Sequence, residues 1–94
     1  MAKFTESSQV SSFRKRLHPE QRRAFKLAFR ELAAGKGEVA PLEDELSGYY
    51  RLRVGHYRMV FRYTTAGEIR CLFVERREVI YELLRANPEW LLED

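Results

Sequence analysis

The sequence has little of what disulfide-rich, metal-binding and membrane-spanning proteins require. Its 94 residues include one cysteine, Cys71, which excludes a disulfide framework within the chain and every zinc motif built from several cysteines. The two histidines, His18 and His56, lie far apart and lack the spacing of ligands on one helix. No apolar run approaches the ~20 residues of a transmembrane helix, and the first residues contain no apolar signal core. We therefore expect a protein without metal, cofactor or membrane partner, in the reducing cytoplasm.

The composition is that of a folded protein in which most of the basic residues are arginine. Hydrophobic residues make up 45% of the chain and charged residues 33%, which predicts one globular domain over residues 1–94. The net charge is only +3, but residues 13–30 carry +6 and residues 46–81 carry +4. Thirteen of the 17 basic residues are arginine, the side chain suited to bidentate phosphate contacts and to stacking.

The N-terminal third predicts two helices after a short strand at Phe4. Residues 7–17 form the first, with Ser7 or Ser8 as its cap, and Pro19 is placed to begin the second. Gly35 and Gly37 end that second helix. Its apolar stripe has three- and four-residue spacing and consists of Ala24, Phe25, Ala28, Phe29 and Leu32.

A β-hairpin is the clearest prediction in the middle of the chain. After a polar connection over residues 36–48, residues 49–54 alternate, Gly55-His56 suits a type II′ turn, and residues 57–63 return. A two-residue turn places Val54 opposite Tyr57 and Arg53 opposite Arg58. One face of the hairpin then carries Tyr49, Arg51, Arg53, Arg58, Val60 and Arg62.

The remaining residues predict one more strand and a closing helix. Residues 68–75 include an apolar run typical of a strand buried on both faces, and residues 76–85 form a helix with Arg77, Tyr81 and Arg85 aligned at four-residue spacing. Val79, Ile80, Leu83 and Leu84 form its apolar side. The expected fold class is α+β: two N-terminal helices packed on one face of a small antiparallel meander, with a short C-terminal helix and the other face free.

The arginines on the free face of the hairpin favour an anionic ligand. Like charges on neighbouring strands destabilise a sheet, and a bound phosphate offsets that repulsion. Tyr49 on this face is suited to stacking on a base. The alternative is a solvated charged surface that guards against edge pairing, or that pairs weakly with Glu68, Glu75 or Glu78.

Two segments resemble a known family. Residues 48–61, GYYRLRVGHYRMVF, resemble the central hairpin motif of the RelE/ParE toxin superfamily, which follows a leucine-containing loop such as residues 46–48. Residues 75–81, ERREVIY, are similar to that family's closing motif. The resemblance covers almost the whole chain and implies the family's fold of two helices, a meander and a closing segment.

The resemblance also implies a function. It indicates the toxin of a type II toxin–antitoxin pair, neutralised by a cognate antitoxin protein. RelE-like members cut mRNA in the ribosomal A site without a metal, leaving a 2′,3′-cyclic phosphate and a 5′-hydroxyl. The alternatives are a ParE-like inhibitor of DNA gyrase and a non-catalytic relative that binds RNA or protein.

Motif positions imply the role of each site residue. Arg51 and Arg53 match the family's paired basic residues, and Arg58 matches the arginine that holds the scissile phosphate. Arg77 and Tyr81 match the arginine and tyrosine of the closing motif, the tyrosine stacking on or orienting the RNA. Further predicted RNA-binding residues are Tyr49, Arg62 and Arg76, the last also an alternative to Arg77.

The chain departs from the RelE pattern at the proton acceptor. Where a RelE-type member has a lysine as candidate base, this chain has Arg51 and Arg53, and arginine stays protonated at any useful pH. Histidine has an ordinary pKa near 6.5, which makes His56 a possible general base. The other candidates are the ribosomal RNA and the side chains of Glu75, Glu78 and Tyr81.

Overall fold

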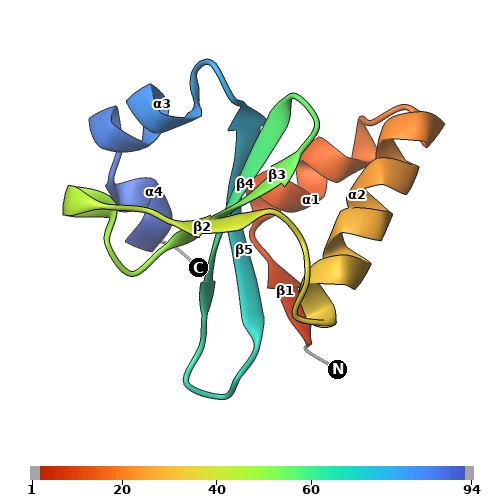
Figure 1. Ribbon diagram of the computed structural model, residues 1–94. Helices are drawn as coiled ribbons and strands as arrows, with labels where there is room; N and C mark the ends of the chain where they lie inside the picture. The colour runs from red at the N-terminus through yellow and green to blue at the C-terminus, as the bar shows by residue number, and fades with distance from the viewer. Residues whose placement is uncertain (1–2, 93–94) are drawn as a thin grey trace.

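A five-stranded sheet separates two groups of helices in the computed structural model, which describes residues 3–92 (Figure 1). The strand order is β1-β5-β4-β3-β2; β1 pairs parallel to β5, and all other neighbours pair antiparallel. No helix within the described residues has the length and apolar character needed to cross a membrane. In chain order the elements are β1 (Phe4–Glu6), α1 (Ser8–Lys15), α2 (Pro19–Ala33), β2 (Val39–Pro41), the 3-10 helix η1 (Asp44–Leu46), β3 (Tyr50–Val54), β4 (Tyr57–Tyr63), β5 (Ile69–Arg76), α3 (Ile80–Ala86) and α4 (Glu89–Leu92).

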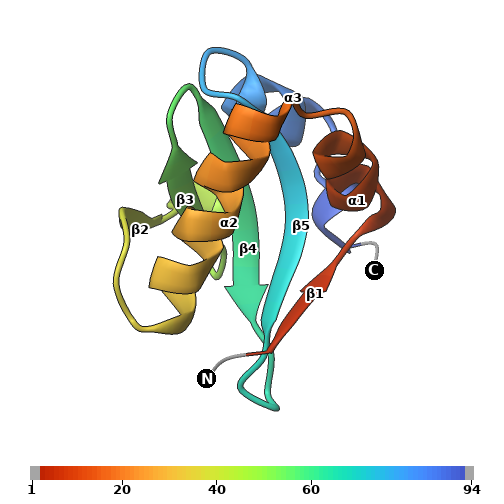
Figure 2. The ribbon, with the colours of Figure 1, turned by 90° about the vertical axis from the view of Figure 1, so that its right-hand side faces the viewer.

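The two N-terminal helices lie on one face of the sheet, as the sequence predicts (Figure 2). Ser7 caps α1 by accepting a hydrogen bond from the backbone N–H of Val10, and α2 begins at Pro19. The apolar side of α2 buries Phe25 and Leu32 against strand residues of the same core. We call this face of the sheet the helical face.

The hairpin has the predicted register. Val54 lies opposite Tyr57 and Arg53 opposite Arg58. Gly55 has φ of +59°, whereas His56 keeps a negative φ, as a type II′ turn requires.

The closing helix begins later than predicted. β5 continues to Arg76, which pairs with Tyr57, so Arg76 belongs to the sheet and not to a helix. Residues 77–79 then form a turn in which the Val79 N–H donates to the Arg76 carbonyl, and α3 starts at Ile80. The prediction of a helix from residue 76 was therefore wrong, because long-range strand pairing overrides local helix propensity. Val79, predicted on the apolar side of that helix, is 39% exposed.

The second face of the sheet is not free, contrary to the prediction. The C-terminal helices cover part of it and bury Ile80, Leu84 and Leu91 against Val60 and neighbouring strand residues. Trp90 stacks on Phe73 with ring centroids 5.1 Å apart. An irregularity in the β4–β5 pairing places Phe73 opposite Val60 and Cys71 opposite Phe61, so that Leu72 is an extra residue on β5. Leu72 and Phe73 both join this second core, which a regular alternation does not predict.

The connection over residues 36–48 contains two elements that the sequence did not reveal. β2 pairs with β3 at the edge of the sheet, with Val39 opposite Leu52. Pro41 ends this strand, a position that proline tolerates because an edge strand has unpaired groups. η1 follows, and its Leu46 is buried in the second core.

Replacing Gln9 is expected to destabilise the fold, because its side chain completes the edge of β5. β1 pairs only with residues 69–71, and beyond them the Gln9 amide donates to the Val74 carbonyl (2.7 Å) and accepts from the Val74 N–H (2.9 Å). Gln9→Ala leaves both partly buried groups unpaired, at about 1–3 kcal/mol of unfolding free energy. Urea unfolding measures the loss, with the exposed Ser12→Ala on the same helix as control. A loss equal to that of the control contradicts this account.

Candidate nucleic-acid interface

The strands place the predicted arginines on one face, opposite the helical face. Arg53 and Arg58 form a cross-strand pair, and Arg51 lies opposite the buried Val60 on the same two strands. Residues opposite each other in an antiparallel pair point to the same side of the sheet. We call this side the arginine face.

Arg58 is the most constrained of these side chains. Its Nη1 donates to the carbonyl oxygens of Gly55 and Tyr57, each at 2.9 Å, which folds the guanidinium back onto the hairpin turn. Partial burial lowers the pKa of Arg58, and the positive charges of Arg53, Arg51 and Arg77 lower it further, whereas Tyr81 acts in the opposite direction. Four cations and one phenol therefore interact electrostatically at this point. We call them the arginine cluster: Arg51, Arg53, Arg58, Arg77 and Tyr81.

A backbone hydrogen bond joins the two sequence motifs. The Arg77 N–H donates to the His56 carbonyl oxygen at 2.9 Å, so the tip of the hairpin is tied to the turn after β5. Arg77 lies in the turn directly after β5 and not on the predicted helix, and this bond holds its backbone next to the hairpin turn. Tyr81 comes from the first turn of α3.

Several arginines form ion pairs with glutamates, as the alternative interpretation of a solvated charged surface expected. Of the three partners named there, Glu78 forms such pairs. Arg53 lies 3.3 Å from Glu38, and Glu78 lies 3.5 Å from Arg76 and 3.3 Å from Arg77. Half of the Arg53 side chain and about half of the Arg77 side chain remain exposed. Such exposed pairs contribute little to stability and release their arginines readily to a competing anion.

Tyr49 and Arg62, two of the predicted RNA-binding residues, are partly buried. Tyr49 packs against the second core, and its hydroxyl lies 3.5 Å from the Leu91 carbonyl oxygen. Arg62 lies opposite Arg70 near the other end of β4. A role of either residue in binding RNA stays a prediction.

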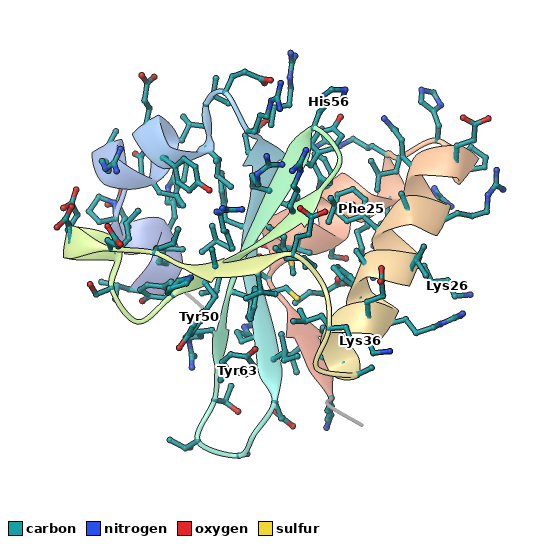
Figure 3. The ribbon with its side chains drawn as sticks, viewed as in Figure 1. Phe25, Lys26, Lys36, Tyr50, His56 and Tyr63 are labelled. Carbon is teal, nitrogen blue, oxygen red and sulfur yellow. The ribbon has the colours of Figure 1, made fainter. Side chains whose placement is uncertain are left out.

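The candidate bases differ in their surroundings. His56 is exposed at the tip of the hairpin (Figure 3). Tyr50 and Tyr63, which are not candidate bases, mark the opposite end of the sheet in the same view. The Glu75 carboxylate accepts a hydrogen bond from the Arg76 N–H at 2.9 Å. A hydrogen bond from its own backbone N–H, followed by the hydrogen bond from Arg77 and the charges of Arg76 and Arg77, lowers the pKa of Glu78, which makes it a weaker base. Within residues 3–92, no three His, Cys, Asp or Glu side chains gather as metal ligands would.

Sequence reasoning missed two arginines near this surface. Arg70 faces the same side as Arg62, a placement that depends on the register of β5. Arg85 lines a hollow together with Arg51 and Tyr81. The four-residue spacing of Tyr81 and Arg85 indicates that they share one face of a helix. No sequence pattern within that segment shows that this face borders the arginine cluster.

Comparisons with known proteins give structural matches only: no protein-family model matches the chain, and no curated protein does. The archaeal RelE–RelB complex from Pyrococcus horikoshii matches with a TM-score of 0.62 and 26% identity over 81% of this chain and 94% of the other. The YoeB–YefM complex from Staphylococcus aureus matches with a TM-score of 0.68 and 17% identity over 82% and 98%. A YoeB/ParE toxin from Agrobacterium tumefaciens matches with a TM-score of 0.58 and 20% identity over 80% and 98%.

These matches confirm the fold that the two motifs implied. The arrangement of two N-terminal helices, a mostly antiparallel sheet and short C-terminal helices extends over nearly the full length of each neighbour. The chain therefore has the fold of the RelE-like toxin superfamily.

Proposed function

We propose that this chain is the toxin of a type II toxin–antitoxin pair and a ribosome-dependent endoribonuclease that cleaves mRNA. The observation that carries the proposal is the arginine cluster, in which three further arginines interact electrostatically with a guanidinium fixed on the hairpin turn. Folding brings these like charges together at a cost in free energy, and a phosphodiester offsets that cost. The partners in this proposal are mRNA, the ribosome and a cognate antitoxin protein, all in the cytoplasm.

The reaction is a phosphoryl transfer within the RNA chain. The 2′-hydroxyl gives its proton to a base and its oxygen attacks the adjacent phosphorus. The O2′–P bond forms, the P–O5′ bond breaks and the leaving O5′ takes a proton from water, which leaves a 2′,3′-cyclic phosphate and a 5′-hydroxyl. Negative charge increases on the non-bridging oxygens in the transition state, and preorganised cations stabilise it more than they stabilise the ground state. Arginine suits this task because it remains charged even where neighbours lower its pKa.

Each member of the arginine cluster has a place in this scheme. Arg58 holds the scissile phosphate, and Arg51 and Arg53 on β3 add positive charge beside it. Arg77 reaches the same phosphate from the turn after β5, and Tyr81 orients the attacking nucleotide. Contacts to the neighbouring RNA come from Tyr49 and Arg62. Arg76 has no such contact in this scheme, because it lies opposite Tyr57, which packs against the core of the helical face.

His56 is the proton acceptor in this proposal. Its backbone binds the Arg77 N–H, so its exposed imidazole lies where the hairpin meets the closing motif. Removal of a positioned general base usually slows a reaction by about 10²- to 10⁴-fold. We expect His56→Gln to slow the cleavage of ribosome-bound mRNA by that factor; a folded His56→Gln protein that cuts as fast as the unaltered chain contradicts the assignment.

Inhibition of DNA gyrase is the second candidate function. Arginine stands where a RelE-type enzyme has its lysine base, and the fold also matches a YoeB/ParE toxin. A protein that blocks gyrase without cutting RNA needs no base at this position.

Two assays on the purified chain separate these candidates. In the first, mRNA is incubated with and without translating ribosomes; we expect cleavage only when ribosomes are present. In the second, the chain is added to a DNA gyrase supercoiling reaction; we expect no inhibition. Intact mRNA together with inhibited supercoiling supports the gyrase alternative and overturns the nuclease proposal.

A further inference from the structure

Two glutamates lie against arginines at the edge of the arginine cluster. A carboxylate oxygen of Glu38 lies 3.3 Å from Nη1 of Arg53, and one of Glu78 lies 3.3 Å from Nε of Arg77. The second oxygen of Glu78 lies 3.5 Å from Nε of Arg76. Each glutamate therefore neutralises part of a positive charge that the proposed function assigns to the RNA.

The backbone places both carboxylates beside the cluster. The Arg53 N–H donates to the carbonyl oxygen of Glu38 at 3.0 Å, directly before β2 begins. On the other side, the Val79 N–H donates to the Arg76 carbonyl oxygen at 3.1 Å and closes the turn that contains Glu78. The two ion pairs are thus a consequence of the fold at the two ends of the cluster.

The other two arginines of the cluster have no such partner. Within residues 3–92, no carboxylate forms an ion pair with Arg51 or Arg58. A phosphate can therefore approach Arg51 and Arg58 directly. It engages Arg53 and Arg77 only by displacing a carboxylate, which also repels it because both groups are negative.

The cost of displacing each carboxylate is moderate, because both pairs are exposed. The Glu38 side chain is 71% exposed, and the side chains of Glu78 and Arg77 are each 49% exposed. Losing one exposed ion pair corresponds to a factor of about 2 to 5 in a binding constant. The two pairs share no side chain, so their effects multiply to about 4- to 25-fold.

Such a penalty affects free RNA more than RNA held on the ribosome. A strand held next to the bound protein has an effective concentration that is roughly millimolar, and it is already ordered, so it fills the site in spite of the penalty. Free RNA has neither advantage. We propose that Glu38 and Glu78 are internal competitors for phosphate that restrict the arginine cluster to RNA held on the ribosome. This proposal rests on the proposed nuclease function and deepens it, because it names residues that make recognition depend on the ribosome.

The first test measures binding without cleavage. A fluorescent single-stranded DNA oligonucleotide has no 2′-hydroxyl and cannot be cut by this reaction, so its anisotropy reports the affinity alone. We expect Glu38→Gln and Glu78→Gln each to bind it about 2- to 5-fold more tightly than the unaltered chain, and the double variant about 4- to 25-fold more tightly. Glutamine keeps the length of the side chain and removes its charge.

Glu31→Gln is the matched control for this measurement. Glu31 is exposed on α2, so the substitution changes the net charge equally at a distance from the cluster. We expect it to bind the oligonucleotide like the unaltered chain. Double-variant binding equal to that of Glu31→Gln would mean that no carboxylate opposes the phosphate. Weaker binding would mean that the glutamates position their arginines for it. Either result overturns the inference.

The second test measures the choice between the two kinds of RNA. Cleavage of mRNA on programmed ribosomes is followed while free RNA of unrelated sequence is added as a competitor. We expect the double variant to be half-inhibited at about 4- to 25-fold less competitor than the unaltered chain or Glu31→Gln. Equal competitor concentrations for all three overturn the inference. Failure of the unaltered chain to cut mRNA overturns the nuclease proposal instead, and the anisotropy comparison still decides whether the glutamates compete with phosphate.

Discussion

Arg58→Ala is expected to reduce cleavage of ribosome-bound mRNA by about 10²- to 10³-fold. That is the usual loss when one preorganised donor to a developing oxyanion is removed. Arg58 holds a central place because the charges of Arg51, Arg53 and Arg77 all act on it. Quantifying intact mRNA over time on programmed ribosomes measures the effect.

The matched control for this variant is Arg30→Ala. Arg30 is exposed on α2, on the helical face, so its removal changes the net charge equally without touching the arginine cluster. Arg58 also donates to two carbonyl oxygens of the hairpin turn, so thermal unfolding must show that the variant is folded at the assay temperature. A folded Arg58→Ala protein that cuts as fast as Arg30→Ala contradicts the assignment of Arg58 to the phosphate.

Leu84→Ala is expected to lower the free energy of unfolding by about 2–5 kcal/mol. Leu84 is 0% exposed on α3 and packs in the second core with Val60 and Ile80. The substitution removes buried methyl groups and leaves a cavity in a core of few residues. Chemical denaturation with urea measures the loss.

Leu27→Ala on α2 is the matched control, because the same substitution there affects a side chain that is 56% exposed. Both leucines lie within helices, where alanine is the better helix former, so helix propensity does not account for a loss at Leu84. A loss below about 1 kcal/mol at Leu84 would mean that α3 does not cover the second face of the sheet.

Local patterns in the sequence predict the elements that depend on neighbouring residues. The register of the hairpin follows from strict alternation and from glycine at the first turn position, and these two features suffice to pair Arg53 with Arg58. The start of α2 at Pro19 and the capping of α1 by Ser7 are equally local.

Contacts between distant segments decide what the sequence did not predict. Arg76 is in a strand because Tyr57, on another strand, pairs with it. Val39 is in a strand because Leu52 offers it an edge, although Pro41 makes the segment look like a loop. The covered second face depends on where residues 80–92 fold back, and a pattern within one segment does not show this.

The same distinction applies to the candidate site. The sequence predicted that Arg51, Arg53 and Arg58 share a face, and the structure adds the turn that brings Arg77 to them. The place of Tyr81 beside the cluster depends on the start of α3, and the hollow toward Arg85 depends on the position of η1. Both are tertiary features.

Mapping the ends of the cleaved RNA tests the central claim most directly. Ribosomes are stalled with a defined codon in the A site, the purified chain is added, and the new 3′ and 5′ ends are located and identified chemically. We expect a single cut within that codon, with a 2′,3′-cyclic phosphate on one fragment and a 5′-hydroxyl on the other. Intact mRNA on competent ribosomes, or fragments with 5′-phosphate ends, would contradict the account.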